Sequence, residues 1–242
     1  MQKRRLDEIL LETDMVLSKE EAFIVVTEGK IFVDGQKAIS PGQPVNPDSK
    51  IELRRGREFV GRGALKLKGA LEQFKIDVTG KVCVDIGAST GGFTQILLRA
   101  GAKKVYAIDT TRGKLDLKLR TDPRVVVMEN TDVRDVQSLP DQVQCVTIDI
   151  SLIPLENILS RIAGHFLQKG TEIIALFKPQ YQTRDQADLK HGIIIDDTVR
   201  QRLLHDFLTW VEENGFEIID QMKSPIQGSE GNIEYLLHLK YG

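Results

Sequence analysis

The chain has 242 residues, of which 41% are hydrophobic and 28% are charged, and its formal net charge is −2. This length allows one large domain together with a small one. This net charge excludes a nucleic-acid-binding protein that is strongly basic over its whole surface, but it is compatible with a local basic patch. No apolar run approaches the ~18 residues of a membrane-spanning helix, and no apolar signal segment follows the basic start. We therefore expect a cytoplasmic protein that makes no membrane contact.

The pattern of residues 1–58 predicts a small α+β domain. Apolar residues at helical spacing predict a first helix over Lys3–Met15. Ser18 followed by Glu21 forms a capping box, which predicts a second helix that ends near Thr27. Two short strands are expected at 30–33 and 51–53, and the turn signal Asp34-Gly35 follows the first of them. We place the domain boundary within the Gly/Arg-rich segment 54–62, so that the second domain covers residues 59–242.

The second domain alternates strands with helices. Its strands are short runs rich in valine and isoleucine, as in parallel strands that are buried on both faces. This alternation predicts an α/β fold with a doubly wound, Rossmann-like sheet. The expected strands are 82–86, 105–108, 125–128, 143–148, 173–177, 216–220 and 233–239, and the expected helices are 63–74, 92–100, 155–166 and 197–214.

The two cysteines, Cys83 and Cys145, both lie in apolar runs. Their spacing matches no metal-binding motif, and a secreted disulfide framework would need more of them. Cysteine is often buried, and thiols stay reduced in the cytosol. We therefore expect two reduced, buried thiols and no metal site.

The segment DIGASTGGFT, from Asp85 to Thr94, joins the first of these strands to a helix. Glycines here allow a tight turn and a close approach of a ligand to the backbone. A dinucleotide fold would prefer G-x-G-x-x-G, whereas this loop has three residues between its first two glycines and an acid before the first. That pattern favours S-adenosylmethionine, with a dinucleotide and a plain structural turn as the alternatives. The residues expected to bind it are Asp85, Gly87, Ala88, Ser89, Gly91, Gly92 and Phe93.

Two acids after the next strands extend this cofactor site. Asp109 ends the second strand of the domain, where a carboxylate can accept both ribose hydroxyls of a nucleoside. Asp132 follows the third strand and is expected to face the adenine end, although a surface acid fits the position as well. Asp85 is expected to complement the amino group of the cofactor, directly or through water.

Four charged residues fall where such a sheet gathers its chemistry. Methyl transfer to a hydroxyl requires loss of the hydroxyl proton, which a positioned base assists, and a lysine serves only if its pKa falls from about 10.4. The candidates are Lys66 in the helix before the first strand, Asp149 and Lys178 at two strand ends, and Glu234 in a late strand. Each alone is typical of a solvated surface group, but together they indicate a catalytic set.

These motifs resemble the TlyA (hemolysin A) family of ribosomal RNA 2′-O-methyltransferases. RGALKL, DIGASTGGFT, LRTDPRV, DISLIPL, FKPQYQ and SPIQGSEGNIEYL stand in the family's order along nearly the whole chain. The second domain resembles the FtsJ-type RNA ribose methylases, whose Lys-Asp-Lys-Glu tetrad implies catalytic roles for Lys66, Asp149, Lys178 and Glu234. The resemblance implies that Lys178 acts on the 2′-hydroxyl, that Asp149 and Lys66 orient it and that Glu234 completes the hydrogen-bonded set. Gly61 departs from the serine common in the family.

The first domain is similar to a small RNA-binding domain first known in a ribosomal protein, through RLDEILLE and KIFVDGQKAISPGQPV. The resemblance implies docking on ribosomal RNA or ribosomal subunits. Residues 1–62 contain as many acidic as basic residues, which weakens this expectation because phosphate contacts dominate RNA affinity. The residues expected to contact RNA are Lys3, Arg4, Arg5, Arg54, Arg55 and Arg62.

Three other functions remain open at this stage. The chain could be an RNA-binding protein with a non-catalytic methylase fold, although the tetrad and the glycine loop are intact. It could be a membrane-lytic protein, as the older family name suggests, although the core needs the apolar faces of its helices. It could methylate a small molecule, which would leave the first domain unexplained.

Overall fold

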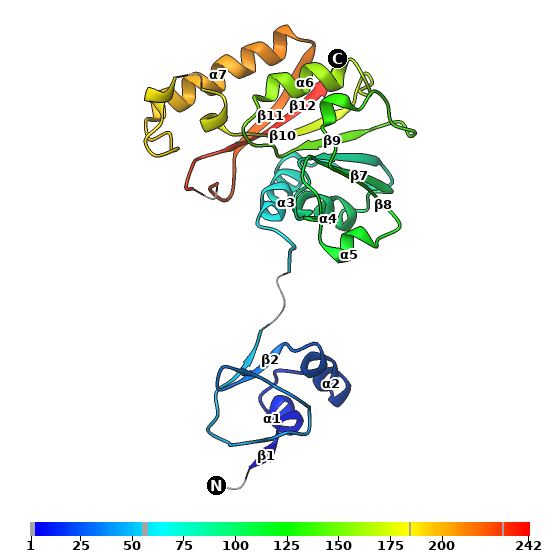
Figure 1. The fold of residues 1–242 in the computed structure, drawn as a ribbon, viewed down its shortest axis with the longest axis vertical. Helices are drawn as coiled ribbons and strands as arrows, with labels where there is room; N and C mark the ends of the chain where they lie inside the picture. The colour runs from blue at the N-terminus through cyan, green and yellow to red at the C-terminus, as the bar shows by residue number, and fades with distance from the viewer. Residues whose placement is uncertain (1–2, 55–57, 184, 229) are drawn as a thin grey trace. The chain divides into compact units, whose positions relative to one another are not determined.

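The computed structural model describes residues 3–54, 58–183, 185–228 and 230–242, and all statements below concern these residues. The chain divides into two compact units, Met1–Glu58 and Phe59–Gly242 (Figure 1). Each unit has its own apolar core. In the described part of the chain, no helix is both long and apolar enough to cross a bilayer.

The first unit packs two short helices against small sheets. Its core is formed by apolar residues of both helices and of the neighbouring strands, with Leu6, Leu10 and Ile31 fully buried. Strand β1 pairs with β4, and the order of the second sheet is β3-β2-β5. The elements are β1 (Arg4–Arg5), α1 (Leu6–Glu12), α2 (Lys19–Thr27), β2 (Ile31–Val33), β3 (Gln36–Lys37), β4 (Pro44–Val45) and β5 (Ile51–Leu53).

The first helix is shorter than the sequence predicts, whereas the start of the second is confirmed. Arg4 and Arg5 are extended and pair with β4, and the Leu6 N–H donates to the carbonyl of Gln43, so α1 begins only at Leu6. The Ser18 hydroxyl accepts from the Glu21 N–H at 3.1 Å, as a capping box requires. The Glu21 carboxylate reaches back one residue further, to the N–H of Leu17.

The second unit is built on a seven-stranded sheet in the order β11-β12-β10-β9-β6-β7-β8. Strands β8, β7, β6, β9 and β10 run parallel, and β12 inserts antiparallel between β10 and β11. The Rossmann-like α/β fold is thus confirmed. The strands are β6 (Val82–Ile86), β7 (Lys104–Asp109), β8 (Val125–Glu129), β9 (Cys145–Ile148), β10 (Glu172–Phe177), β11 (Phe216–Lys223) and β12 (Tyr235–Tyr241).

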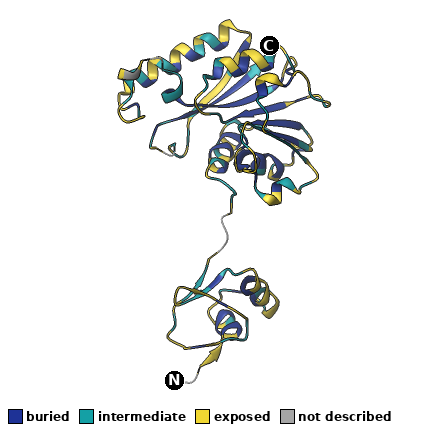
Figure 2. Ribbon diagram, in the orientation of Figure 1, coloured by how far each residue is buried: buried dark blue, intermediate teal, exposed yellow. Residues whose placement is uncertain are grey.

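Helices cover both faces of this sheet, α3 and α4 on one face and α6 and α7 on the other (Figure 1). Successive residues of a strand point to opposite faces of the sheet, and each face has its own apolar core. Val84 belongs to the core that includes α6 and α7, whereas Cys83 belongs to the core that includes α3 and α4. Figure 2 shows the central strands almost wholly buried. The helices are α3 (Gly63–Phe74), α4 (Gly92–Arg99), α5 (Leu117–Arg120), α6 (Leu155–Ala163) and α7 (Asp197–Glu213), with 3-10 turns η1 (Val133–Asp135), η2 (Pro179–Tyr181) and η3 (Gln186–Asp188).

The starts of two strands differ from the sequence prediction, that of β12 near the candidate site and that of β9 at the opposite end of its strand. Strand β12 begins at Tyr235, so Glu234 lies directly before the strand and not within it. The Glu234 carbonyl accepts from the Ser224 N–H just beyond the end of β11, outside the registered strand pairs. Strand β9 begins at Cys145, two residues later than predicted. Lys178 and Asp149 directly follow β10 and β9, as predicted.

Candidate active site

The glycine loop between β6 and α4 packs closely against two other segments. Gly87 has φ +83°, and a Cβ there would lie 2.3 Å from the carbonyl oxygen of Asp149. A Cβ on Gly92 would lie 2.9 Å from the backbone nitrogen of Ala64 in α3. Both positions therefore require glycine, because any side chain would displace the backbone of a neighbouring segment. The loop thus packs against both the carboxyl end of β9 and the start of α3.

The residues of this loop divide into two groups. Gly87, Ala88, Ser89, Gly92 and Phe93 line a small hollow that also includes Gly61, Arg62, Gly63, Thr90 and Asp149. Gly91 faces the other way, since a Cβ there would lie 2.2 Å from a methyl group of Leu119 in α5. Gly91 thus lets α5 pack against the outside of the loop.

Asp85, which is expected to complement the amino group of the cofactor directly or through water, lies beneath the glycine loop, and its role toward the cofactor stays a prediction. Its side chain is fully buried, and its two carboxylate oxygens accept from the hydroxyls of Thr94 at 2.6 Å and Thr147 at 3.1 Å. Burial raises the pKa of Asp85 to about 6, against the opposing effect of the two hydroxyls. Asp85 therefore links the first turn of α4 to β9 through these two hydrogen bonds, and in this way it supports the glycine loop between β6 and α4.

Asp109 and Asp132 line a second hollow at the carboxyl ends of β6, β7 and β8. Asp109 accepts from the N–H of Ser89 at 2.8 Å and from the N–H of Thr111 at 2.7 Å. Asp132 caps η1 and pairs with Arg134 at 2.6 Å, which lowers the pKa of Asp132. The apolar walls come from Ile86, Ile108, Val133, Ile150, Ile153 and Ile158. Apolar walls with two carboxylates at the rim suit a nucleoside.

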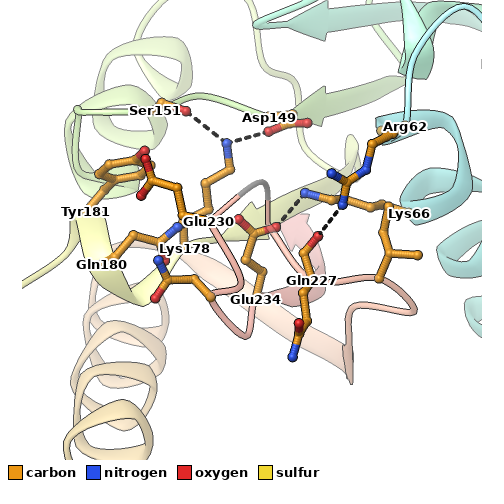
Figure 3. Close-up of a pocket in the computed structure, with 13 residues that line it drawn as sticks. Arg62, Lys66, Asp149, Ser151, Lys178, Gln180, Tyr181, Gln227, Glu230 and Glu234 are labelled. Carbon is orange, nitrogen blue, oxygen red and sulfur yellow. Dashed lines mark hydrogen bonds and ion pairs between the residues drawn. The ribbon is translucent and has the colours of Figure 1, made fainter. Parts of the chain in front are cut away.

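Lys66, Asp149, Lys178 and Glu234 converge in a third hollow (Figure 3). The Lys66 Nζ lies 2.5 Å from a Glu234 carboxylate oxygen, and the Lys178 Nζ lies 2.7 Å from Asp149 Oδ1. Lys66 and Lys178 are each 8% exposed and Glu234 is 3% exposed, so these charges are largely withdrawn from water. Two ion pairs thus face one pocket, with their residues drawn from widely separated parts of the chain.

This charged pocket can hold a polar group and exchange a proton with it. Lys178 has a second partner, the Ser151 hydroxyl at 3.1 Å, which fixes its amine at the pocket wall. The Glu234 carboxylate also accepts from the Gln180 amide at 3.4 Å. A buried ion pair is costly unless other hydrogen bonds satisfy its members, and these contacts supply them.

Asp149 lines all three hollows. Its carbonyl approaches Gly87, its Oδ1 holds Lys178, and the hollow of the glycine loop lies beside it. A ligand in the hollow lined by Asp109 and Asp132 and one in the charged pocket would therefore meet at Asp149. Such a shared wall allows a group to pass directly between two bound molecules.

Sequence reasoning missed several residues of the charged pocket. Ser151 follows Asp149 by two residues, and Gln180 follows Lys178 by two, so both belong to the strand-end segments already recognised. Asn232 is 2% exposed and accepts from the Ile194 N–H at 3.1 Å, which joins two loops at the pocket. The signal available for all three was proximity to a candidate residue at a strand end.

The structure changes the expectation for the basic residues. Three arginines of the first unit that the structure describes are paired within the unit: Arg4 with Glu12, Arg5 with Asp7 and Arg54 with Glu52. Arg54 also lies over the ring of Phe32 at 3.8 Å. Lys3 lines a groove in the first unit, and Arg62 lines the charged pocket of the second. Arg55 lies outside the described residues. Local carboxylates thus pair with three of the six residues expected to contact RNA, and the contact of these six with RNA stays a prediction.

The sheet with its antiparallel β12, the glycine loop and the paired hollows define a Rossmann-like methyltransferase. The family described as FtsJ-like methyltransferase matches residues 59–241, and the chain belongs to this family.

Relatives match over nearly the full length. The chain is 37% identical to hemolysin A of Brachyspira hyodysenteriae over 97% of this chain and 98% of the relative. It is 35% identical to the 16S/23S rRNA (cytidine-2′-O)-methyltransferase TlyA of Mycobacterium tuberculosis, over 98% of this chain and 90% of that protein. A solved structure from Streptococcus thermophilus, also named as a hemolysin, is 33% identical, with a TM-score of 0.74 over 100% of this chain and 89% of the other.

Proposed function

We propose that the protein transfers a methyl group from S-adenosylmethionine to a ribose 2′-hydroxyl of ribosomal RNA. The observation that carries this proposal is the position of Asp149, where the hollow lined by Asp109 and Asp132 meets a pocket with two ion pairs, one of them buried and the other half-buried at Asp149. The similarity to a relative named as an rRNA cytidine-2′-O-methyltransferase supports the same chemistry.

The residues present fit S-adenosylmethionine. Asp109 would accept the ribose hydroxyls, Asp132 would face the adenine edge, and the isoleucines between them would contact the ring. The methionine end would lie along Gly87, Ser89 and Gly92, where the hollow of the loop reaches Asp149. When bound, the cofactor supplies an electrophilic methyl group.

Lys178 is assigned the central role in this reaction. Its amine would accept the proton of the 2′-hydroxyl as that oxygen forms its bond to the methyl carbon, while the bond from this carbon to the cofactor's sulfur breaks and its electron pair stays on the sulfur. The ammonium that results is the form that Asp149 and Ser151 hold through their contacts at 2.7 Å and 3.1 Å. The proton then passes to water when the methylated product leaves.

Lys66 and Glu234 are assigned a positioning role on the other side of the pocket. Their ion pair places a fixed donor and a fixed acceptor next to the substrate, where they hold the ribose in line with the methyl group. Gln180 keeps the Glu234 carboxylate in place through its amide.

The first unit is proposed to dock the enzyme on ribosomal RNA or on a ribosomal subunit in the cytoplasm. The resemblance of RLDEILLE and KIFVDGQKAISPGQPV to a ribosomal-protein RNA-binding domain supports this, whereas the internal pairing of Arg4, Arg5 and Arg54 argues for modest affinity. We therefore expect that the fit between the first unit and the folded RNA, and contacts made by the second unit, also contribute to recognition of the RNA.

The test is transfer of a labelled methyl group from S-adenosylmethionine to isolated ribosomal subunits. The wild-type chain should label ribosomal RNA, and Lys178→Ala should abolish labelling while it leaves cofactor binding nearly intact. Lys68→Ala is the matched control, because Lys68 is an exposed lysine of α3 that pairs only weakly with Glu72. Full activity of Lys178→Ala, or loss in both variants alike, would contradict the assignment.

A further inference from the structure

Glu129 is a carboxylate whose contacts the proposed mechanism does not use. It ends β8, and its backbone is the register partner of Asp109 at the end of β7. Its side chain is 10% exposed. The two carboxylates thus belong to neighbouring strand ends, of which Asp109 lines the hollow at the ends of β6, β7 and β8, and they have different partners.

Glu129 accepts four hydrogen bonds from one segment of chain. The N–H groups of Gly113, Lys114 and Leu115 donate to it at 2.8, 3.1 and 3.1 Å, and the Arg120 guanidinium donates at 2.7 Å. Arg120 and the backbone donors lower the pKa of Glu129 to about 2, so the carboxylate remains an anion at any pH at which the enzyme would work.

The segment that Glu129 holds forms one wall of the cofactor hollow. Thr110, Thr111 and Lys114 line this hollow. Asp109 holds the same segment only at Thr111, through an N–H at 2.7 Å and a hydroxyl at 2.5 Å. Glu129 therefore secures the remainder of the segment.

The same segment also supports the glycine loop from outside. Leu115 and Leu119 are 5% and 6% exposed, and a Cβ on Gly91 would lie 2.8 Å and 2.2 Å from their methyl groups. Leu115 carries an N–H that Glu129 binds, and Leu119 precedes Arg120. The anchor at Glu129 thus reaches both walls of the cofactor site, the segment after β7 and the glycine loop after β6.

We infer that Glu129 is a positioning residue that holds both walls of the cofactor site and thereby sets the affinity for S-adenosylmethionine. The inference rests on the proposed function and adds a residue to it. Glu129 contacts neither the charged pocket nor the groups that move the proton. Its loss should therefore weaken cofactor binding and leave the transfer step unchanged once the cofactor is bound.

The test compares Glu129→Gln with Glu129→Asp and with Asp141→Asn. Glutamine removes the charge and turns a donor toward backbone N–H groups, whereas aspartate keeps the anion with a shorter reach. Asp141 is the control, because it accepts from Lys104 and Tyr106 on β7 and lines neither the cofactor hollow nor the charged pocket, so its loss should affect stability only. Calorimetry measures binding of S-adenosylmethionine, and hydrogen exchange measures protection of the amides at 113–115.

Loss of a hydrogen-bonded charge of this kind predicts a Kd for S-adenosylmethionine about ten- to a hundredfold higher in Glu129→Gln, with faster exchange at 113–115. Glu129→Asp should restore part of the affinity. KM for the cofactor should rise in parallel, while kcat at saturating cofactor and KM for RNA stay near wild type. Unchanged affinity in Glu129→Gln, or an equal loss in Asp141→Asn, would overturn the inference. A wild-type chain that binds no cofactor would instead contradict the proposed function.

Discussion

Replacing Gly87 with alanine tests the contact that joins the glycine loop to Asp149. Gly87 has φ +83°, and the new Cβ would lie 2.3 Å from the Asp149 carbonyl oxygen. Gly80 is a matched control, since it has φ +70° and open space around its Cβ position. The left-handed conformation costs an alanine about 1–2 kcal/mol at either site. The clash at Gly87 adds about 1–3 kcal/mol, because backbone must move to relieve it.

Thermal unfolding and calorimetry measure the two consequences. A change of 1 kcal/mol shifts Tm by about 2–4 °C in a chain of this size, so Gly87→Ala should lower Tm by several degrees more than Gly80→Ala. Movement of Asp149 should also weaken binding of S-adenosylmethionine at least about tenfold in Gly87→Ala alone. Equal Tm losses and unchanged cofactor binding in both variants would refute the proposed contact between loop and strand end.

The remaining predictions concern three charged groups. Burial raises the pKa of Asp85 from 3.8 to about 6. Between these two pH values the native state therefore binds more protons than the unfolded state. The free energy of unfolding should fall by about 3 kcal/mol as the pH rises through this range. Asp85→Asn should remove that fall, as urea unfolding between pH 4 and pH 7 would measure; an identical slope in both proteins would contradict it. Glu234→Ala should cost about 3–5 kcal/mol by leaving Lys66 buried without its partner, and Lys66→Met in the same chain should recover part of this loss. Glu52→Gln should free Arg54 and steepen the salt dependence of binding to ribosomal RNA, whereas an unchanged slope would exclude Arg54 as a phosphate contact.

The strands and their order of appearance follow directly from the sequence. The runs at 82–86 and 173–177 are continuous apolar stretches, as expected for strands covered on both faces, and the structure places strands there. Pro179 lies just after β10, as the sequence predicts, and Lys178 therefore lies at the carboxyl end of this strand. These features are predictable because backbone hydrogen bonding and burial repeat with a fixed period.

Side-chain partners are less predictable than strands, because they depend on contacts between distant segments. Asp85 has the position of a ligand in the sequence, yet Thr94 and Thr147 occupy both of its oxygens. Arg4 and Arg5 form a basic run in the sequence, yet each faces a carboxylate. The sequence brings the four candidate catalytic residues to strand and helix ends, and only the structure shows that they form two pairs. Their roles in the reaction stay predictions.

The position of the transferred methyl group tests the central proposal most directly. Ribosomal subunits would be incubated with the wild-type chain and labelled S-adenosylmethionine, and the RNA would then be digested to nucleosides and analysed by mass spectrometry. A label on the ribose of a defined nucleotide, absent with Lys178→Ala, is the predicted result. A label on a base, or no label in RNA while the cofactor binds, would contradict the assignment of the charged pocket to a ribose hydroxyl.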